Sequence, residues 1–181
     1  MADPRLEILV PEAELRARVV ELGAQISADY RGRDLVLVCL LKGALFFCAD
    51  LARAVTLPLR LEFLRAASYG AGATSSGSVR LGELAPGAFA ERDVLVVEDI
   101  VDSGLTLARI LEAIGGAGPR SLEVCCLLHK ERARSRPVPL RYVGFRIPDR
   151  FVVGYGLDHG ERYRNLPHVA VLAPDGGPER G

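Results

Sequence analysis

Residues 94–106 read Val-Leu-Val-Val-Glu-Asp-Ile-Val-Asp-Ser-Gly-Leu-Thr. The first four residues are apolar and mostly β-branched, which is typical of a strand buried on both faces of a parallel sheet. Two acidic residues follow this strand. The turn at Ser103-Gly104 then leads into a predicted helix over 103–114, which is closed by Gly115-Gly116. A buried strand, a tight turn and a helix in this order predict one unit of an α/β fold.

The same stretch also indicates chemistry. A turn at the start of a helix directs backbone N–H groups outward, and these groups bind anions such as phosphate. The neighbouring Glu98 and Asp99 suit ribose hydroxyls or a hydrated Mg²⁺ ion. The stretch matches neither a Walker P-loop nor a Rossmann glycine pattern. A purely structural alternative makes Asp102 the N-cap of the helix and leaves the two acidic residues as solvated charges.

The rest of the chain repeats the alternation of strands and helices. One helix is predicted over 11–28, because Leu15, Val19, Leu22 and Ile26 fall on one face. A second helix is expected over 43–54. Strands are predicted at 34–41, 59–64, 79–81, 94–97, 122–128, 142–145, 151–153 and 169–172. The pattern predicts a mostly parallel, twisted sheet flanked by helices, in which ligands bind beyond the carboxyl ends of the strands.

Composition limits the class of protein. The chain has 181 residues, 49% of them hydrophobic, and 23 basic residues balance 23 acidic ones. A single domain with a buried core is therefore expected, without the basic surface of a nucleic-acid binder. The apolar runs, such as 35–41, are too short to cross a membrane, and the N-terminus is polar. We expect a cytoplasmic protein that binds neither nucleic acid nor membrane.

Cysteines and histidines give no metal-binding pattern. The three histidines are scattered, and none of the cysteines forms a Cys-x-x-Cys pair. We expect four reduced and buried thiols, at Cys39, Cys48, Cys125 and Cys126.

Residues 94–106 resemble the phosphoribosyl-pyrophosphate motif of the type I phosphoribosyltransferases at every position. Lys42-Gly43, Lys130 and the string 143–166 are similar to the hypoxanthine-guanine branch of that family. The resemblance covers about residues 6–173. It implies one domain over 1–181, with a core at about 30–145 and a small hood from about 5–15 and 146–173.

The resemblance implies a role for each matching residue. Asp102 would be the catalytic general base, and Glu98, Asp99 and Asp158 would hold Mg²⁺. Ser68 and Tyr69 would belong to a lid, in the glycine- and serine-rich segment 67–78. The implied ligands of phosphoribosyl pyrophosphate are Leu41, Lys42, Gly43, Glu98, Asp99, Asp102, Ser103, Gly104, Leu105, Thr106 and Arg164. The implied contacts with the purine come from Ile100, Lys130, Phe151, Val152 and Asp158.

The implied activity is purine salvage, in which hypoxanthine or guanine and phosphoribosyl pyrophosphate give IMP or GMP and pyrophosphate. Lys130 would donate to O6 of the purine, which favours 6-oxopurines over adenine. In the family the peptide before the pyrophosphate-loop lysine, here Leu41–Lys42, is often cis. A homodimer or homotetramer is expected. Two alternatives stay open: a xanthine-preferring transferase, and a regulatory protein that only senses phosphoribosyl pyrophosphate.

Overall fold

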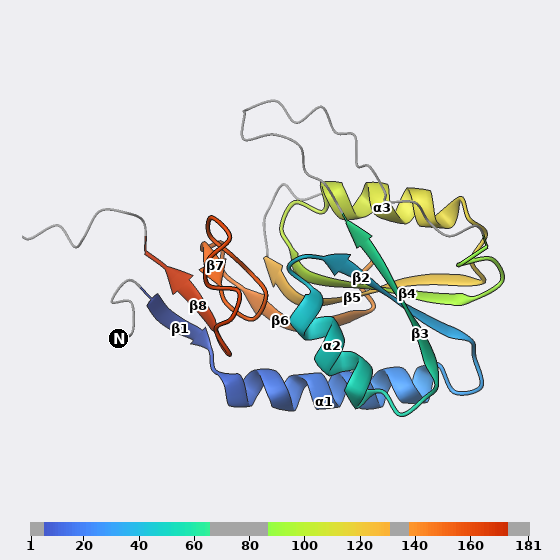
Figure 1. Cartoon of the computed structure of the whole chain (residues 1–181), viewed down its shortest axis with the longest axis horizontal. Helices are drawn as coiled ribbons and strands as arrows, with labels where there is room; N and C mark the ends of the chain where they lie inside the picture. The colour runs from blue at the N-terminus through green and yellow to red at the C-terminus, as the bar shows by residue number, and fades with distance from the viewer. Residues whose placement is uncertain (1–5, 66–86, 131–137, 174–181) are drawn as a thin grey trace, which may run out of the picture.

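The fold is known from a computed structural model, which describes residues 6–65, 87–130 and 138–173. Helices and strands alternate along much of the described chain (Figure 1). The helices are α1 (Glu12–Asp29), α2 (Leu45–Ala54) and α3 (Leu105–Gly115). The strands are β1 (Leu6–Val10), β2 (Leu35–Leu41), β3 (Leu59–Arg65), β4 (Asp93–Val101), β5 (Ser121–Lys130), β6 (Tyr142–Ile147), β7 (Val152–Val153) and β8 (Val169–Leu172).

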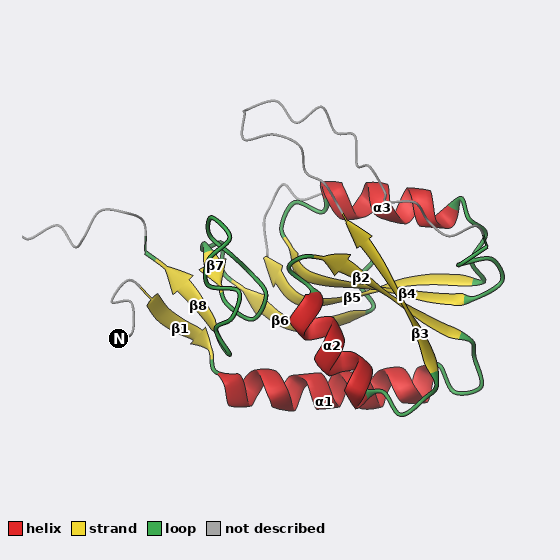
Figure 2. Cartoon of the chain, in the orientation of Figure 1, coloured by secondary structure: helices red, strands yellow, loops and turns green. Residues whose placement is uncertain are grey.

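Five parallel strands form the main sheet, in the order β3-β2-β4-β5-β6. Helices α1 and α2 lie on one side of this sheet and α3 on the other (Figure 2). Strand β2 and the adjacent parts of β4 and β5 are buried on both faces, which explains the uninterrupted apolar run of β2, whereas β3 at the side of the sheet is mostly exposed or half-buried. This arrangement confirms the α/β fold class and the parallel sheet predicted from the sequence.

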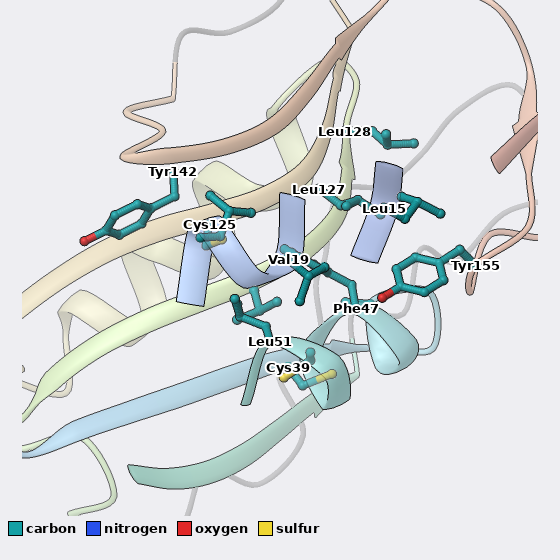
Figure 3. Packing of buried hydrophobic residues seen from close by; sticks show 14 of the residues in the cluster. Leu15, Val19, Cys39, Phe47, Leu51, Cys125, Leu127, Leu128, Tyr142 and Tyr155 are labelled. Atoms are coloured by element: carbon teal, nitrogen blue, oxygen red, sulfur yellow. The ribbon is translucent and has the colours of Figure 1, made fainter. Parts of the chain in front are cut away.

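Two apolar cores fill the faces of the sheet. The larger core joins α1 and α2 to the sheet and includes the predicted helix face of Leu15, Val19, Leu22 and Ile26 (Figure 3). The second core joins α3 to the opposite face. All four cysteines are buried and free, as predicted. No helix in the described ranges is long and apolar enough to span a membrane.

A second, antiparallel sheet joins the terminal segments in the order β1-β8-β7. Strand β1 was not among the strands predicted from the sequence, and it pairs with β8 more than 150 residues later. Strand β4 is longer than predicted, because it continues through Glu98 and Asp99 to Val101. The predicted strand at 79–81 lies outside the described residues.

The segment after β2, which includes Gly43, packs very closely against its neighbours. A Cβ placed on Gly43 would lie 1.7 Å from Oδ2 of Asp99, and one on Gly156 would lie 1.9 Å from the Gly43 carbonyl oxygen. Gly156 also has a φ of +106°, a backbone conformation that disfavours other residues. Glycine at these two positions lets β4, the segment after β2 and the segment after β7 meet at one point.

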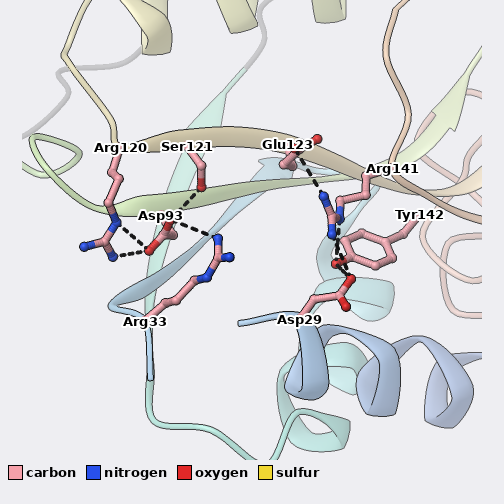
Figure 4. A network of polar contacts seen from close by, with 8 residues as sticks. All are labelled: Asp29, Arg33, Asp93, Arg120, Ser121, Glu123, Arg141 and Tyr142. Carbon is pink, nitrogen blue, oxygen red and sulfur yellow. Dashed lines mark hydrogen bonds and ion pairs between the residues drawn. The ribbon is translucent and has the colours of Figure 1, made fainter. Parts of the chain in front are cut away.

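At the opposite end of the sheet, the Asp93 carboxylate ties the start of β4 to neighbouring segments (Figure 4). Its side chain is 1% exposed and accepts hydrogen bonds from Arg120 Nε at 3.0 Å and Ser121 Oγ at 2.7 Å. Arg33 lies 3.6 Å from the same carboxylate. The hydrogen bond from Arg120 is the main reason why the pKa of Asp93 is lowered from its ordinary value.

We expect Asp93→Asn to lower the free energy of unfolding at pH 7 by about 1.5–3 kcal/mol, the range for hydrogen bonds to charged groups. The pKa of Asp93 is lower in the folded state, so the ionised carboxylate stabilises the fold above the unfolded pKa of about 3.9. As the pH falls below this value the contribution decreases, and it is lost when the pH passes through the lower pKa of the folded state. Urea unfolding from neutral to acidic pH should show the difference between wild type and variant shrinking. Asp34→Asn is the control, since its more exposed ion pairs are expected to contribute less than about 1 kcal/mol.

We expect Gly156→Ala to destabilise the protein by about 2 kcal/mol or more, because it combines an unfavourable φ with a clash against backbone. Gly115→Ala is the matched control. It lies in α3, where a Cβ would meet only Leu122 Cδ2 at 4.0 Å, and alanine is the better helix former. Thermal unfolding of both variants tests this. Equal melting temperatures would contradict the close-packing argument.

Candidate active site

The carboxyl ends of the parallel strands carry most of the residues that the sequence singled out. Strands β2, β4 and β5 end at Leu41, Val101 and Lys130. Because the strands are parallel, these ends lie along one edge of the sheet. A cavity of about 110 Å³ opens there beside the β4–α3 turn. It is lined by Glu98, Ile100, Val101, Asp102, Ser103, Gly104, Thr106 and Leu107.

The turn between β4 and α3 has the geometry of an anion site. Gly104 is the N-cap of α3, with a φ of +73°. A glycine here has no side chain to cover the first N–H groups of the helix, and the turn at Ser103 and Gly104 lines the cavity. The structural alternative, in which Asp102 caps the helix, is wrong, since the helix begins two residues after Ser103.

Glu98 and Asp99 form a pair of largely buried carboxylates. Burial, together with the negative charge of Asp99, raises the pKa of Glu98 well above its ordinary value. Burial also raises the pKa of Asp99, whose Oδ1 accepts a hydrogen bond from the Ile100 amide at 2.9 Å. Two desolvated carboxylates side by side favour binding of a cation.

These two carboxylates alone do not make a closed metal site. Within the described ranges, no group of three or more histidine, cysteine, aspartate or glutamate side chains is placed to hold a metal ion. Mg²⁺, however, is usually held by one or two carboxylates together with substrate phosphates and water. The donor set of Glu98 and Asp99 therefore fits a magnesium ion that binds with a phosphorylated substrate.

The segment after β2 lies against this pair. The Leu41–Lys42 peptide is cis. Gly43 packs on Asp99, and the Lys42 side chain extends to Glu161, with 2.9 Å between Nζ and Oε2. This ion pair lowers the pKa of Glu161, chiefly through the hydrogen bond that Lys42 donates.

Arg164 is joined to the same group of charges. Its guanidinium lies 2.7 Å from Asp158 Oδ1 and 3.2 Å from Glu161 Oε1, and it donates to the Gly156 carbonyl at 2.8 Å. Asp158 also accepts a hydrogen bond from the Glu161 amide at 2.8 Å. Lys42, Asp158 and Arg164, which the sequence placed together in function, are thus linked in space through Glu161.

Lys130 is a buried cation between two carboxylates. Its side chain is 9% exposed, and Nζ lies 3.6 Å from Asp102 Oδ2 and 3.5 Å from Asp149 Oδ1. A buried lysine is stable only where acceptors or anions offset its desolvation. The sequence reasoning selected Lys130 and Asp102 separately and gave no role to Asp149.

Phe151 presents an aromatic ring next to β7. The residue is 51% exposed, whereas the next residue, Val152, is buried in β7. The ring of His159 stands edge-on to Phe151, with 5.5 Å between centroids and an interplanar angle of 81°. An exposed ring held by an aromatic neighbour is suited to stacking on a flat ligand. No role had been given to His159 from the sequence.

The structure therefore brings together most of the predicted site residues. Ser68 and Tyr69, expected in a lid, lie outside the described residues. Three further residues, Asp149, His159 and Glu161, contact predicted site residues and were missed. They lie within the string 143–166, but no period or spacing distinguishes them from their neighbours there, and only the folded chain shows their contacts.

Comparison with known proteins agrees with this arrangement. Residues 9–159 match the family model of the phosphoribosyl transferase domain. Hypoxanthine phosphoribosyltransferase of Salmonella typhimurium is 46% identical over 169 residues, or 92% of this chain and 95% of the relative. Hypoxanthine-guanine phosphoribosyltransferase of Mycobacterium avium is 48% identical over 173 residues, or 92% of this chain and 85% of the relative.

A solved structure shows the same fold. A hypoxanthine phosphoribosyltransferase from Staphylococcus aureus aligns with a TM-score of 0.88 and 40% identity, covering 94% of this chain and 93% of that one. The relationship thus extends over nearly the whole chain, and the resemblance inferred from the motifs is confirmed. The chain belongs to the phosphoribosyltransferase family, in the branch of the hypoxanthine and hypoxanthine-guanine phosphoribosyltransferases.

Proposed function

We propose that this protein is a purine-salvage transferase that moves the 5-phosphoribosyl group of phosphoribosyl pyrophosphate to N9 of hypoxanthine or guanine. The products are IMP or GMP and pyrophosphate. One observation carries the proposal: the Asp102 carboxylate and the Lys130 ammonium lie 3.6 Å apart beside the phosphate-binding turn. The names of the related enzymes support the same choice of substrate.

Asp102 and Lys130 suit one edge of a 6-oxopurine. On a purine such as guanine, N7 and O6 lie next to each other on that edge. Lys130 donates to O6, and Asp102 accepts the proton of N7. Adenine presents an amino group in place of O6, and a lysine cannot accept a hydrogen bond from it. Lys130 therefore selects a 6-oxopurine, and Asp102 activates the same purine by accepting its N7 proton.

Further contacts hold the base in place. Phe151 stacks on the purine ring, and the backbone of Val152 pairs with its edge. Ile100, which lines the cavity beside the β4–α3 turn, also contacts the base. The backbone of Asp158 meets the 2-position, where hypoxanthine, guanine and xanthine differ.

Phosphoribosyl pyrophosphate binds along the sheet edge. The turn 102–106, with the hydroxyls of Ser103 and Thr106, holds the 5′-phosphate at the N-terminus of α3. Glu98 and Asp99 position the ribose diol. The segment Leu41-Lys42-Gly43 and Arg164 hold the diphosphate, to which lysine and arginine donate charge-assisted hydrogen bonds.

Mg²⁺ fits this site as a companion of the substrate. Glu98 and Asp99 would hold one ion, and Asp158 would hold a second after giving up part of its contact with Arg164. When bound, the metal supplies positive charge that offsets the charge of the diphosphate.

In the reaction, N9 of the purine forms a bond to C1′ of the ribose as the bond between C1′ and the diphosphate oxygen breaks. Positive charge develops on the sugar, and the negative charge moves to the leaving group. Lys42 and Arg164 stabilise that leaving group. Asp102 takes the N7 proton, which completes the neutral base in the product.

The remaining assignments belong to the same proposal. The chain forms one domain, with a core at about 30–145 and a hood from about 5–15 and 146–173. Ser68 and Tyr69 belong to a lid that excludes water. The protein is a cytoplasmic homodimer or homotetramer.

A spectrophotometric assay with hypoxanthine, guanine, xanthine and adenine in turn, each with and without Mg²⁺, tests the proposed function. We expect nucleotide from hypoxanthine or guanine, little from adenine, and loss of turnover without the metal. A dominant rate with xanthine would replace the proposed substrate by the xanthine alternative. Absence of product from every 6-oxopurine would refute the proposed activity.

Asp102→Asn keeps the shape of the side chain and removes its ability to take a proton. Loss of a general base lowers turnover by about 10²–10⁴-fold. We expect kcat to fall by this factor while the affinity for phosphoribosyl pyrophosphate stays within about threefold. Asp29→Asn is the control, since Asp29 is the last residue of α1, accepts a hydrogen bond from the Tyr142 hydroxyl and does not line the cavity. An unchanged kcat in Asp102→Asn would remove the catalytic role.

A further inference from the structure

Glu161 occupies a position between the two cations to which we assign the diphosphate. Its carboxylate contacts both of them, with Oε2 at 2.9 Å from Lys42 Nζ and Oε1 at 3.2 Å from Arg164 Nη2. Within the part of the chain that the structure describes, Glu161 is the only carboxylate that forms an ion pair with Lys42. The two carboxylate oxygens of Glu161 thus bridge Lys42 and Arg164.

The backbone places this side chain by a tight turn. His159 and Arg162 exchange backbone hydrogen bonds at 3.2 Å, so Gly160 and Glu161 form a two-residue hairpin loop. Their φ values are +59° and +65°, as in a type I′ turn. Glycine, asparagine and aspartate are the residues that such turns favour, so the turn itself does not require glutamate.

A carboxylate and a phosphoryl group are both anions that accept hydrogen bonds from the same cationic side chains. Lysine and arginine donate to either of them through charge-assisted hydrogen bonds. Glu161 is also 65% exposed, so its ion pairs are weak enough to exchange. An anionic ligand that reached Lys42 and Arg164 would have to replace these contacts.

We propose that Glu161 is an internal competitor of the diphosphate: its carboxylate pairs with Lys42 and Arg164 in place of the diphosphate and sets how tightly pyrophosphate is held. The inference rests on the proposed function, because that function assigns the two cations to the diphosphate. Glu161 offsets part of their charge, and each binding event includes the cost of displacing it. The residue thereby weakens product binding, which favours release of pyrophosphate.

If Glu161 has a purely structural role, its substitution should change the Kd of pyrophosphate in the opposite direction. If Glu161 only holds Lys42 and Arg164 in position, its removal loosens both cations and weakens pyrophosphate binding. The competitor predicts that its removal strengthens binding. The direction of the change in Kd therefore separates the two roles.

The experiment is calorimetric titration of inorganic pyrophosphate with MgCl₂ into the full-length protein and its variants. Glu161→Gln removes the charge at nearly constant size. Glu161→Asn removes it with a residue that tolerates positive φ, which protects the turn. We expect both variants to bind pyrophosphate about three- to tenfold more tightly, as loss of two exposed ion pairs implies.

Glu21→Gln is the matched control. Glu21 is 60% exposed and pairs with Arg18 at 2.6 Å on α1, so this variant changes net charge equally without touching the site. It should leave the Kd unchanged. Weaker or unchanged binding in both Glu161 variants overturns the proposal, and so does absence of pyrophosphate binding to every form.

The purine assay separates this inference from the function on which it rests. If wild type forms nucleotide but the Glu161 variants do not bind pyrophosphate more tightly, only the inference fails. If wild type forms none, the proposed function fails whatever the titration shows.

Discussion

The site depends on the close packing of Gly43 between Asp99 and Gly156. A Cβ on Gly43 would lie 1.7 Å from the Asp99 carboxylate, and one on Gly156 would lie 1.9 Å from the Gly43 carbonyl oxygen. These contacts connect the segment after β2 to β4 and to the segment after β7. That connection brings the residues assigned to the diphosphate and those assigned to the base to one edge of the sheet. Side chains at these positions would push the three segments apart.

The main sheet could be predicted from sequence because its signals are local. The apolar run 35–41 is buried along its length, and the face formed by Leu15, Val19, Leu22 and Ile26 is buried as its period indicates. Strand β1 could not be predicted in this way. Its residues are mostly exposed or half-buried, and its pairing with β8 is a contact between the two ends of the chain. Burial that arises from distant partners leaves no periodic pattern in a short strand.

In the candidate site, too, some residues could be predicted from the sequence and others could not. Glu98, Asp99, Asp102 and Lys130 could be selected, because they follow recognisable strands and match the motifs of a family. Their partners could not. Asp149 lies near Lys130 only because β6 runs beside β5, and the contact of His159 with Phe151 depends on the turns after β7. A motif shows which residues act, whereas the neighbours that contact them, even within the string 143–166, are known only once the chain is folded.

The charge balance among the side chains of the site follows from this packing. Lys130 lies between two carboxylates, and Arg164 between Asp158 and Glu161. Each cation is therefore already paired before substrate arrives, because a desolvated charge without a partner would cost several kcal/mol. The free energy of substrate binding is then the difference between the contacts that the substrate makes with these cations and the ion pairs that it replaces. A site arranged in this way holds its cations in place and still releases a highly charged product, because the internal carboxylates return as the product leaves.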